Sequence, residues 1–152
     1  HKVKANWKLL VENETDGYHP QVTHASIFEV AQSGIGPLYN EAADSVTRYF
    51  GNGHSELDLR PEFRKFNEPM RWFGTSEIMV DGVRHVMIFP NLFIAEIQLF
   101  VLQPLSVSET VQHVTALQFK GAPDLNRRMR QQTRGSVGPA GFLLADDAEM
   151  YE

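Results

Sequence analysis

The sequence contains no cysteine, and this absence limits the chemistry that its 152 residues can perform. Without thiols the chain cannot form a disulfide, a cysteine-ligated zinc site or an iron–sulfur cluster of its own. A catalytic thiol nucleophile is excluded for the same reason. Glycine-rich phosphate loops and Gly-x-Ser-x-Gly nucleophile elbows are also missing.

The sequence also has no excess of basic residues and no long apolar run. It carries 14 Lys and Arg against 19 Asp and Glu, a net charge of −5, so it has no basic surface of the kind that binds nucleic acid. No segment approaches the roughly 20 apolar residues of a membrane-spanning helix, and the start lacks a signal-peptide pattern. We therefore expect a cytoplasmic protein that binds neither nucleic acid nor membrane.

What is present is an ordinary globular composition and one unusual segment. The chain is 42% hydrophobic and 22% charged, and its length suits a single domain. His19 and His24 lie five positions apart, and Asp16 precedes the first by three. In a regular α-helix this spacing places the two rings about 140° apart, and Pro20 disfavours regularity. A shared metal ion therefore requires a distorted helix or a helix end, although close histidines are also common as surface residues.

A carboxylate pair near the other end supplies the missing ligand type. Asp146 and Asp147 follow an apolar run that begins after Gly138-Pro139-Ala140-Gly141. Two histidines and one carboxylate form the facial triad that leaves open positions on Fe(II) for oxygen and substrate. His54 is an alternative third ligand, but a polar residue at the start of a strand explains it better, because Asp147 already supplies the carboxylate of the triad.

Periodicity predicts a mixture of helices and antiparallel strands. In chain order we expect an extended lead into a helix over 2–13 with Trp7 in the core, a helix over 38–50, a half-exposed strand over 55–59, and a hairpin of 77–80 with 83–88 about Asp81-Gly82.

Two long strands follow, over 92–102 and 107–119, separated by 103–106 and paired in a meander whose inward face lines a cavity. A basic helix then runs from Leu125 to about Thr133 and ends at Arg134 and Gly135. Its arginines, Arg127, Arg128 and Arg130, fit either a solvated helix face or a docking surface for an acidic electron-transfer partner.

Taken together, several segments resemble the catalytic domain of the α subunit of Rieske-type aromatic-ring-hydroxylating oxygenases. They are the string from Asn6 to Asn13, then Asp16-Gly17-Tyr18-His19 with His24, then Gly138-Pro139-Ala140-Gly141 with Asp146-Asp147. The spacing of these blocks is specific as a set, whereas each half alone is weak, and the resemblance covers essentially the whole chain. It implies an α+β fold in which a curved antiparallel sheet packs around a helix, the helix-grip arrangement.

The resemblance also implies a site and its cofactors. His19, His24 and Asp147 match the ligands of a mononuclear non-haem Fe(II), and Asp146 matches a neighbour that is not a ligand. Asp16 matches a catalytic aspartate that bridges His19 to a histidine of the Rieske cluster in a neighbouring subunit. From the residues alone, Asp16 could equally fix the His19 tautomer. Electrons would come from a [2Fe-2S] Rieske cluster, fed by NAD(P)H through a reductase or ferredoxin.

The resemblance extends to a substrate pocket and to an assembly. The positions that match pocket walls are Asn13, His85, Ala95, Val137 and Leu143. The partners implied are an aromatic substrate, O2, an electron donor and further subunits in a homotrimer or an α3β3 complex. Because the cluster ligands require cysteine, the Rieske domain would lie outside these residues, and we expect the chain to be a fragment that is inactive alone.

Judged from the residues alone, two functions of other classes remain possible. The same two histidines and aspartate could hold zinc in a hydrolase that activates water. A curved sheet gripping a helix could also bind a hydrophobic ligand without any catalysis.

Overall fold

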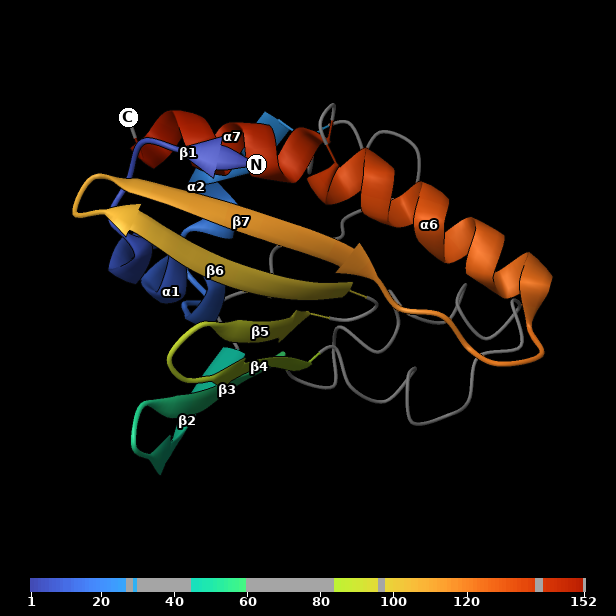
Figure 1. Ribbon diagram of the computed structural model, residues 1–152, viewed down its shortest axis with the longest axis horizontal. Coiled ribbons are helices and arrows are strands. Elements are labelled where there is room, and N and C mark those ends of the chain that lie inside the picture. Colours follow the sequence, from blue (N-terminus) through green and yellow to red (C-terminus); the bar gives the residue numbers. More distant parts are fainter. Residues whose placement is uncertain (27–28, 30–44, 60–83, 96–97, 139–140, 152) are drawn as a thin grey trace.

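In the computed structural model, a single curved antiparallel sheet is the frame of the molecule (Figure 1). The described residues are 1–26, 29, 45–59, 84–95, 98–138 and 141–151. The sheet has seven strands in the order β1-β7-β6-β5-β4-β3-β2, and every neighbouring pair is antiparallel. Their bounds are β1 Lys2–Val3, β2 Ser45–Gly51, β3 His54–Leu59, β4 Arg84–Ile88, β5 Leu92–Ala95, β6 Gln98–Ser106 and β7 Glu109–Ala116.

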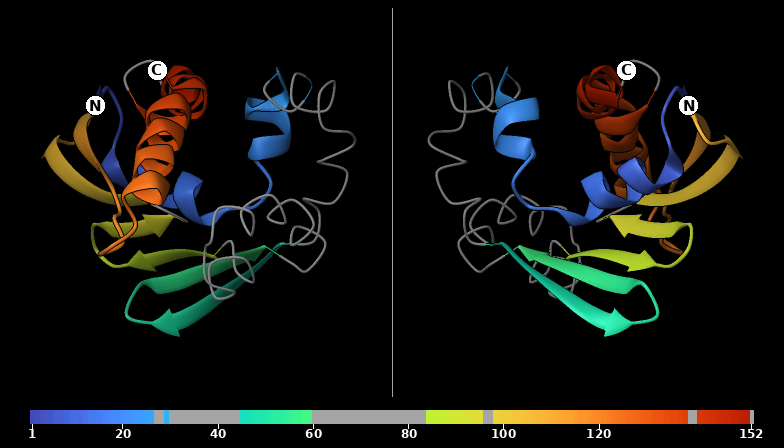
Figure 2. Two further views of the ribbon diagram at one scale, coloured as in Figure 1. Left: turned by 90° about the vertical axis from the view of Figure 1, so that its right-hand side faces the viewer. Right: turned by 90° about the vertical axis from the view of Figure 1, so that its left-hand side faces the viewer.

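The helices gather on the concave side of this sheet, as the end-on views show (Figure 2). They are α1 Trp7–Thr15, the one-turn α2 Pro20–Thr23, α6 Pro123–Val137 and α7 Phe142–Tyr151. Helix α1 contacts β3, β4 and β6, while α6 contacts β7 and α7. The expected α+β architecture, a curved antiparallel sheet around helices, is thereby confirmed. None of the described helices is long and apolar enough to cross a membrane.

Two apolar clusters fill the space between the sheet and the helices. One joins β4, β5 and β6 to α6 and α7 and contains Met87, Phe93, Ala95, Phe100, Val137 and Leu144. The other joins β1, α1 and β6 and contains Val3, Ala5, Leu10 and Leu102. Val11 of α1 packs against both, so this helix links the two halves of the core.

The extended segment and the first helix form as predicted, but the residue that this helix buries in the core is not the predicted one. Asn6 caps α1 by accepting a hydrogen bond from the Lys8 backbone N–H at 3.0 Å. Leu10, 1% exposed, is the buried residue of this helix. The expectation that Trp7 lies in the core is wrong, because its ring is only partly buried, against the exposed Phe89 with the centroids 6.0 Å apart.

The region after the histidines corrects a helix prediction. Residues 45–50 belong to strand β2 and not to a helix, because this strand pairs with β3 across the turn 52–53. Val46, Thr47, Tyr49 and Phe50 are β-branched or aromatic residues that favour strands. The predicted strand over 55–59 is confirmed within β3, whereas residues 38–44 of the predicted helix lie outside the described residues.

The predicted meander of antiparallel strands is confirmed, but its strands begin and end at other residues than predicted. The predicted strand over 92–102 is two strands, β5 and β6, which pair with each other. Residues 103–106 continue β6, and the turn to β7 comes after Ser106. Pro104 is tolerated because β5 pairs with β6 only as far as Val101, so the missing N–H of Pro104 faces a side where no described strand continues.

Two further predictions meet the structure in part. Strand β4 realises the second half of the predicted hairpin, but it pairs with β3 and β5, and the residues 77–80 lie outside the described part. The basic helix begins with Asp124 in its first turn, as expected, yet it continues past Arg134 and Gly135 to Val137. The buried Val137 joins the first apolar cluster, which accounts for the extra turn.

Candidate metal centre

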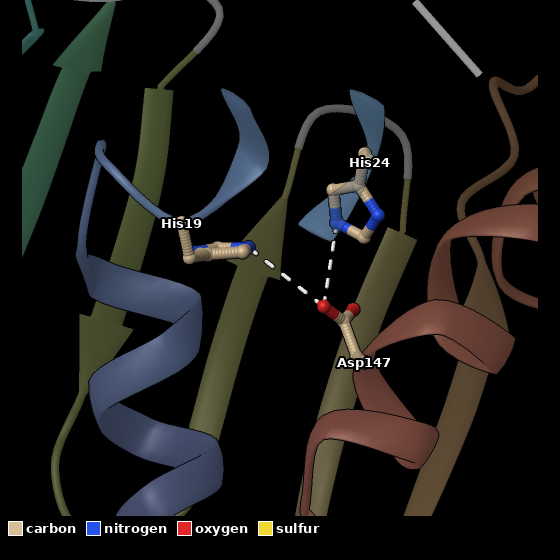
Figure 3. A group of neighbouring side chains, drawn as sticks. All are labelled: His19, His24 and Asp147. Carbon is tan, nitrogen blue, oxygen red and sulfur yellow. Dashed lines mark ion pairs between the residues drawn. The ribbon is translucent and has the colours of Figure 1, made fainter. Parts of the chain in front are cut away.

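His19 and His24 flank the one-turn helix α2 rather than sharing a regular helix. His19 is the residue that caps its start, Pro20 takes the first position, and His24 caps its end. The geometry confirms the expectation of an irregular segment. It turns both Nε2 atoms toward the same carboxylate, with the rings 5.4 Å apart and nearly perpendicular (Figure 3).

That carboxylate is Asp147 on helix α7. Its Oδ1 lies 3.3 Å from Nε2 of His24 and 3.8 Å from Nε2 of His19. One ligand atom from each of the three residues falls within 4.8 Å of the other two. Asp147 is only 7% exposed, and its Oδ1 has no hydrogen-bond partner among the described residues.

The three groups fit a transition-metal ion. Bonds of about 2.0–2.2 Å from nitrogen and oxygen to one ion place neighbouring ligand atoms roughly 3 Å apart. The 3.3 Å between Oδ1 of Asp147 and Nε2 of His24 is close to that value, whereas the 3.8 Å to Nε2 of His19 is longer. A cation between the three groups would satisfy the buried carboxylate oxygen. Two imidazoles and one carboxylate suit iron, zinc and similar ions, so the donor set alone does not choose between them.

Neighbouring carboxylates orient both imidazoles. Asp16 ends α1 and accepts hydrogen bonds from the backbone N–H groups of Tyr18 and His19 at 3.0 and 2.9 Å. Its Oδ1 also lies 2.7 Å from Nδ1 of His19. With the proton on Nδ1, the Nε2 lone pair of His19 is free for a metal ion. The contact that a tautomer role of Asp16 requires, between its Oδ1 and Nδ1 of His19, is therefore present.

Asp146 acts more weakly on His24. Its Oδ2 lies 3.4 Å from Nδ1 of that ring. Burial lowers the pKa of His24, but the contacts with Asp147 and Asp146 outweigh burial and raise the pKa above its ordinary value. The side chain of Asp146 faces Nδ1 of His24, whereas Asp147 faces Nε2. This arrangement fits the roles that the resemblance implies, with Asp147 as a metal ligand and Asp146 as its neighbour.

A second buried acid lies close to this centre. Glu14 of α1 accepts a hydrogen bond from Nε2 of Gln112 on β7 at 2.9 Å. Desolvation of its carboxyl group, together with the charge of Asp147, raises the pKa of Glu14 to about 8, against the lowering effect of the Gln112 hydrogen bond. Burial, and then the charges of Asp147, Glu14 and Asp16, also raise the pKa of Tyr151 on α7.

From the sequence, Asn13 and Glu14 lie about one turn before Asp16 and His19, so either could face the metal cavity, and the resemblance favours Asn13. Gln112 and Tyr151 were not predicted from the sequence. Asn13 lies half-buried on α1. The signal for Gln112 was its place in β7, where it alternates with outward residues as Thr110 does, so a polar side chain stands at an inward position. The hydrogen bond from Gln112 to Glu14 forms only because the fold packs β7 beside α1, so the sequence alone could not indicate it.

The other predicted pocket positions gather beside the first apolar cluster. His85 and Ala95 are direct partners across β4 and β5. Ala95 and Val137 belong to the cluster, and Leu143 packs against it. Desolvation of its ring, and then the proximity of His19, lower the pKa of His85 to about 4, so this ring is neutral at pH 7.

His54, the alternative ligand, accepts a hydrogen bond from the Phe89 backbone N–H through Nδ1 and is not part of the three-residue group.

Comparisons with known proteins identify the family. The family described as "Ring hydroxylating alpha subunit (catalytic domain)" matches residues 1–152. The chain is 31% identical to the large oxygenase component of the naphthalene 1,2-dioxygenase system of Pseudomonas aeruginosa, over 99% of this chain and 39% of that protein. It is 30% identical to the large oxygenase component of the 2,4-dinitrotoluene dioxygenase system of Burkholderia sp. (strain RASC), over 95% of this chain and 38% of that protein.

Solved structures agree in fold. A naphthalene 1,2-dioxygenase with indole bound in its active site superimposes with a TM-score of 0.78 and 24% identity, covering 100% of this chain and 40% of the other. The chain thus spans about two fifths of the length of the relatives it matches. On the match along all its residues and the identity to these oxygenase components, this chain belongs to the family of ring-hydroxylating oxygenase α subunits, in the catalytic domain.

Proposed function

We propose that the protein carrying this chain is a terminal oxygenase that hydroxylates an aromatic ring with O2 at a mononuclear Fe(II) site. The observation that carries the proposal is the convergence of His19, His24 and Asp147, with a buried carboxylate oxygen facing both Nε2 atoms. We assign these three residues as the iron ligands. Iron bound by them would supply the one-electron chemistry that activates O2.

The residues around the ligands have separate tasks. Asp16 keeps the His19 proton on Nδ1, and Asp146 faces Nδ1 of His24. The apolar cluster that contains Ala95 and Val137 holds the ring of the substrate and excludes water. The neutral His85, opposite Ala95, and the half-buried Asn13 and Leu143 complete the proposed pocket wall.

Electrons enter, in this proposal, from a [2Fe-2S] Rieske cluster in another part of the protein, supplied by NAD(P)H through a ferredoxin or reductase. All three contacts of Asp16 use Oδ1. We therefore assign Oδ2 to a cluster-ligating histidine of a neighbouring subunit, in a homotrimer or an α3β3 complex. Replacing Asp16 with Asn should leave iron bound but slow, by at least tenfold, the oxidation of the reduced Rieske cluster in a single turnover with O2, measured by stopped-flow spectroscopy.

The central test is iron content together with product formation. We expect the full-length protein, reconstituted anaerobically, to bind one Fe(II) per chain at this site and to hydroxylate an aromatic probe such as naphthalene when reductant and O2 are supplied. Asp147→Asn should lower iron occupancy and product at least a hundredfold. Glu149→Gln, an exposed acid two residues along α7, is the matched control and should keep both.

Two results would contradict the proposal. One is full iron occupancy in Asp147→Asn, because the carboxylate would then not be a ligand. The other is a reconstituted protein that forms product only with zinc and without O2 or reductant, which is the behaviour of a hydrolase using the same residues.

A further inference from the structure

Two buried polar side chains at the border of the first apolar cluster each carry an oxygen without a hydrogen-bond partner in the described part of the chain. Gln98 at the start of β6 is 8% exposed and Thr133 of α6 is 7% exposed. Oε1 of Gln98 and Oγ1 of Thr133 have no partner among the described residues. Buried acceptors in native proteins are nearly always paired, with protein, water or ligand. These two oxygens therefore mark a place where another molecule supplies a donor.

The sheet register places Gln98 in line with His85 across β6, β5 and β4. Its burial alternates in phase with Phe100 and Leu102, so its side chain is on the concave face. Gln98 pairs with Ala95, and Ala95 pairs with His85. Adjacent strands are about 4.8 Å apart, so Gln98 lies roughly 10 Å across the sheet from His85. His85 in turn lies close enough to His19 for its pKa to respond to it.

Small residues flank the amide, and α6 adds the second oxygen. The direct cross-strand partners of Gln98 on its two sides are Ala95 and Ala116, both with small side chains. Thr133 lies one helical turn before Val137, on the same face of α6, and Val137 packs in the cluster with Ala95. The polar pair therefore borders the same apolar region as the predicted pocket wall.

We propose that Gln98 is a specificity-determining residue that hydrogen-bonds a donor group, a hydroxyl or an N–H, on the aromatic substrate at the end of the ring far from the metal. Thr133 supports the same group from α6. The roughly 10 Å between Gln98 and His85 suits a bicyclic ring whose near edge faces the metal centre. This inference rests on the proposed function only in taking an aromatic ring as the ligand.

A binding experiment with four ring probes tests the amide directly. The probes are naphthalene, 2-naphthol, 2-methylnaphthalene and 2-naphthoate, of which 2-naphthol and 2-methylnaphthalene have nearly the same size and differ in the donor. Affinities are measured by calorimetry on the full-length, iron-loaded protein, anaerobic and without reductant, so that no turnover occurs. We expect 2-naphthol to bind about tenfold more tightly than 2-methylnaphthalene, as for one buried hydrogen bond.

Three variants locate this preference. Gln98→Leu should bring the ratio of the two affinities to about one while leaving naphthalene binding the same or tighter, and Thr133→Val should reduce the ratio severalfold. Gln118→Leu, at an exposed glutamine after β7, is the matched control and should keep the tenfold ratio. Circular dichroism on each variant confirms that it is folded.

The proposal fails if the wild-type ratio is near one, which would mean that water satisfies the amide, or if folded Gln98→Leu keeps the tenfold ratio. It also fails if 2-naphthoate binds best, or if none of the probes binds. Loss of iron binding or of product formation, with the ratio intact, would instead contradict the proposed function alone.

Discussion

At the scale of single residues, the centre combines groups that the sequence reveals with groups that it hides. His19, His24 and Asp147 stand out because few other residue types can hold a metal, and the structure brings their ligand atoms within 4.8 Å. Glu14 and Gln112 gave only a faint signal, because a glutamate on a helix and a glutamine on a strand are ordinary residues. The hydrogen bond between them joins residues 98 positions apart in the sequence, so it can be recognised only in the folded chain.

Glu14 makes the stability of the metal-free protein depend on pH. The unfolded carboxyl group ionises near 4.5, but the folded one keeps its proton up to about pH 8. Its burial therefore destabilises the fold increasingly as pH rises from 4.5 to 8, and the penalty is constant above that. Glu14→Gln should raise the free energy of unfolding by on the order of 4 kcal/mol at pH 8 and by only a few tenths of a kcal/mol at pH 4.5.

The measurement is urea unfolding of both proteins, with chelator, at several pH values between 4.5 and 8.5. Glu12→Gln, at an exposed position on the same helix, should show no such trend. An equal difference between wild type and Glu14→Gln at every pH would rule out the buried proton as its cause.

At the scale of elements, local pattern predicted the strands better than their ends. The alternation in 55–59 and the turn residues of 51–54 predicted strand β3 and the turn before it. Residues 45–50 satisfied a helical period and were predicted as helix, so the β2–β3 hairpin was missed. Pairing with β3 decides their state, and this interaction is invisible to a local window. The same holds for 103–106, where Pro104 suggested a break although the neighbouring strand had already ended on that side.

The β2–β3 loop gives an element-scale prediction with an internal control. Gly51 and Gly53 both have positive φ, +86° and +84°. A Cβ at Gly53 would lie 2.5 Å from Cγ of Phe89, whereas one at Gly51 meets nothing within 4 Å. Gly51→Ala should therefore cost about 1 kcal/mol of backbone strain, and Gly53→Ala about 2–3 kcal/mol.

Urea unfolding of the two variants checks this order. In a Phe89→Ala background the extra cost of Gly53→Ala should disappear, because the clashing ring is gone. Equal costs for both glycines in the wild-type background would show that the Phe89 ring moves aside freely.

At the scale of the whole molecule, the centre joins two ends of the chain. His24 follows α2, near the first helix, and its partner Asp146 lies 122 residues later on α7. Helix α2 contacts α7 directly. A metal ion bound between them therefore stabilises the folded state, because the unfolded chain offers no comparable set of ligands.

Hydrogen exchange can detect this link between the ends. Fe(II), added anaerobically to the full-length protein, should slow amide exchange in α2 and α7 together by tenfold or more. The first turns of α6, which lie away from the centre, should change little (Figure 1). Protection of only one of the two helices would mean that the ion binds without joining them.

The position of Asp147 in α7 has a consequence for biosynthesis. A growing polypeptide presents both imidazoles to the cell long before the ribosome has made their carboxylate partner. During that interval the nascent chain can offer an ion only two nitrogen ligands. Binding of a metal ion by all three residues of this centre is thus deferred until translation has passed α7 and that helix has docked against α2.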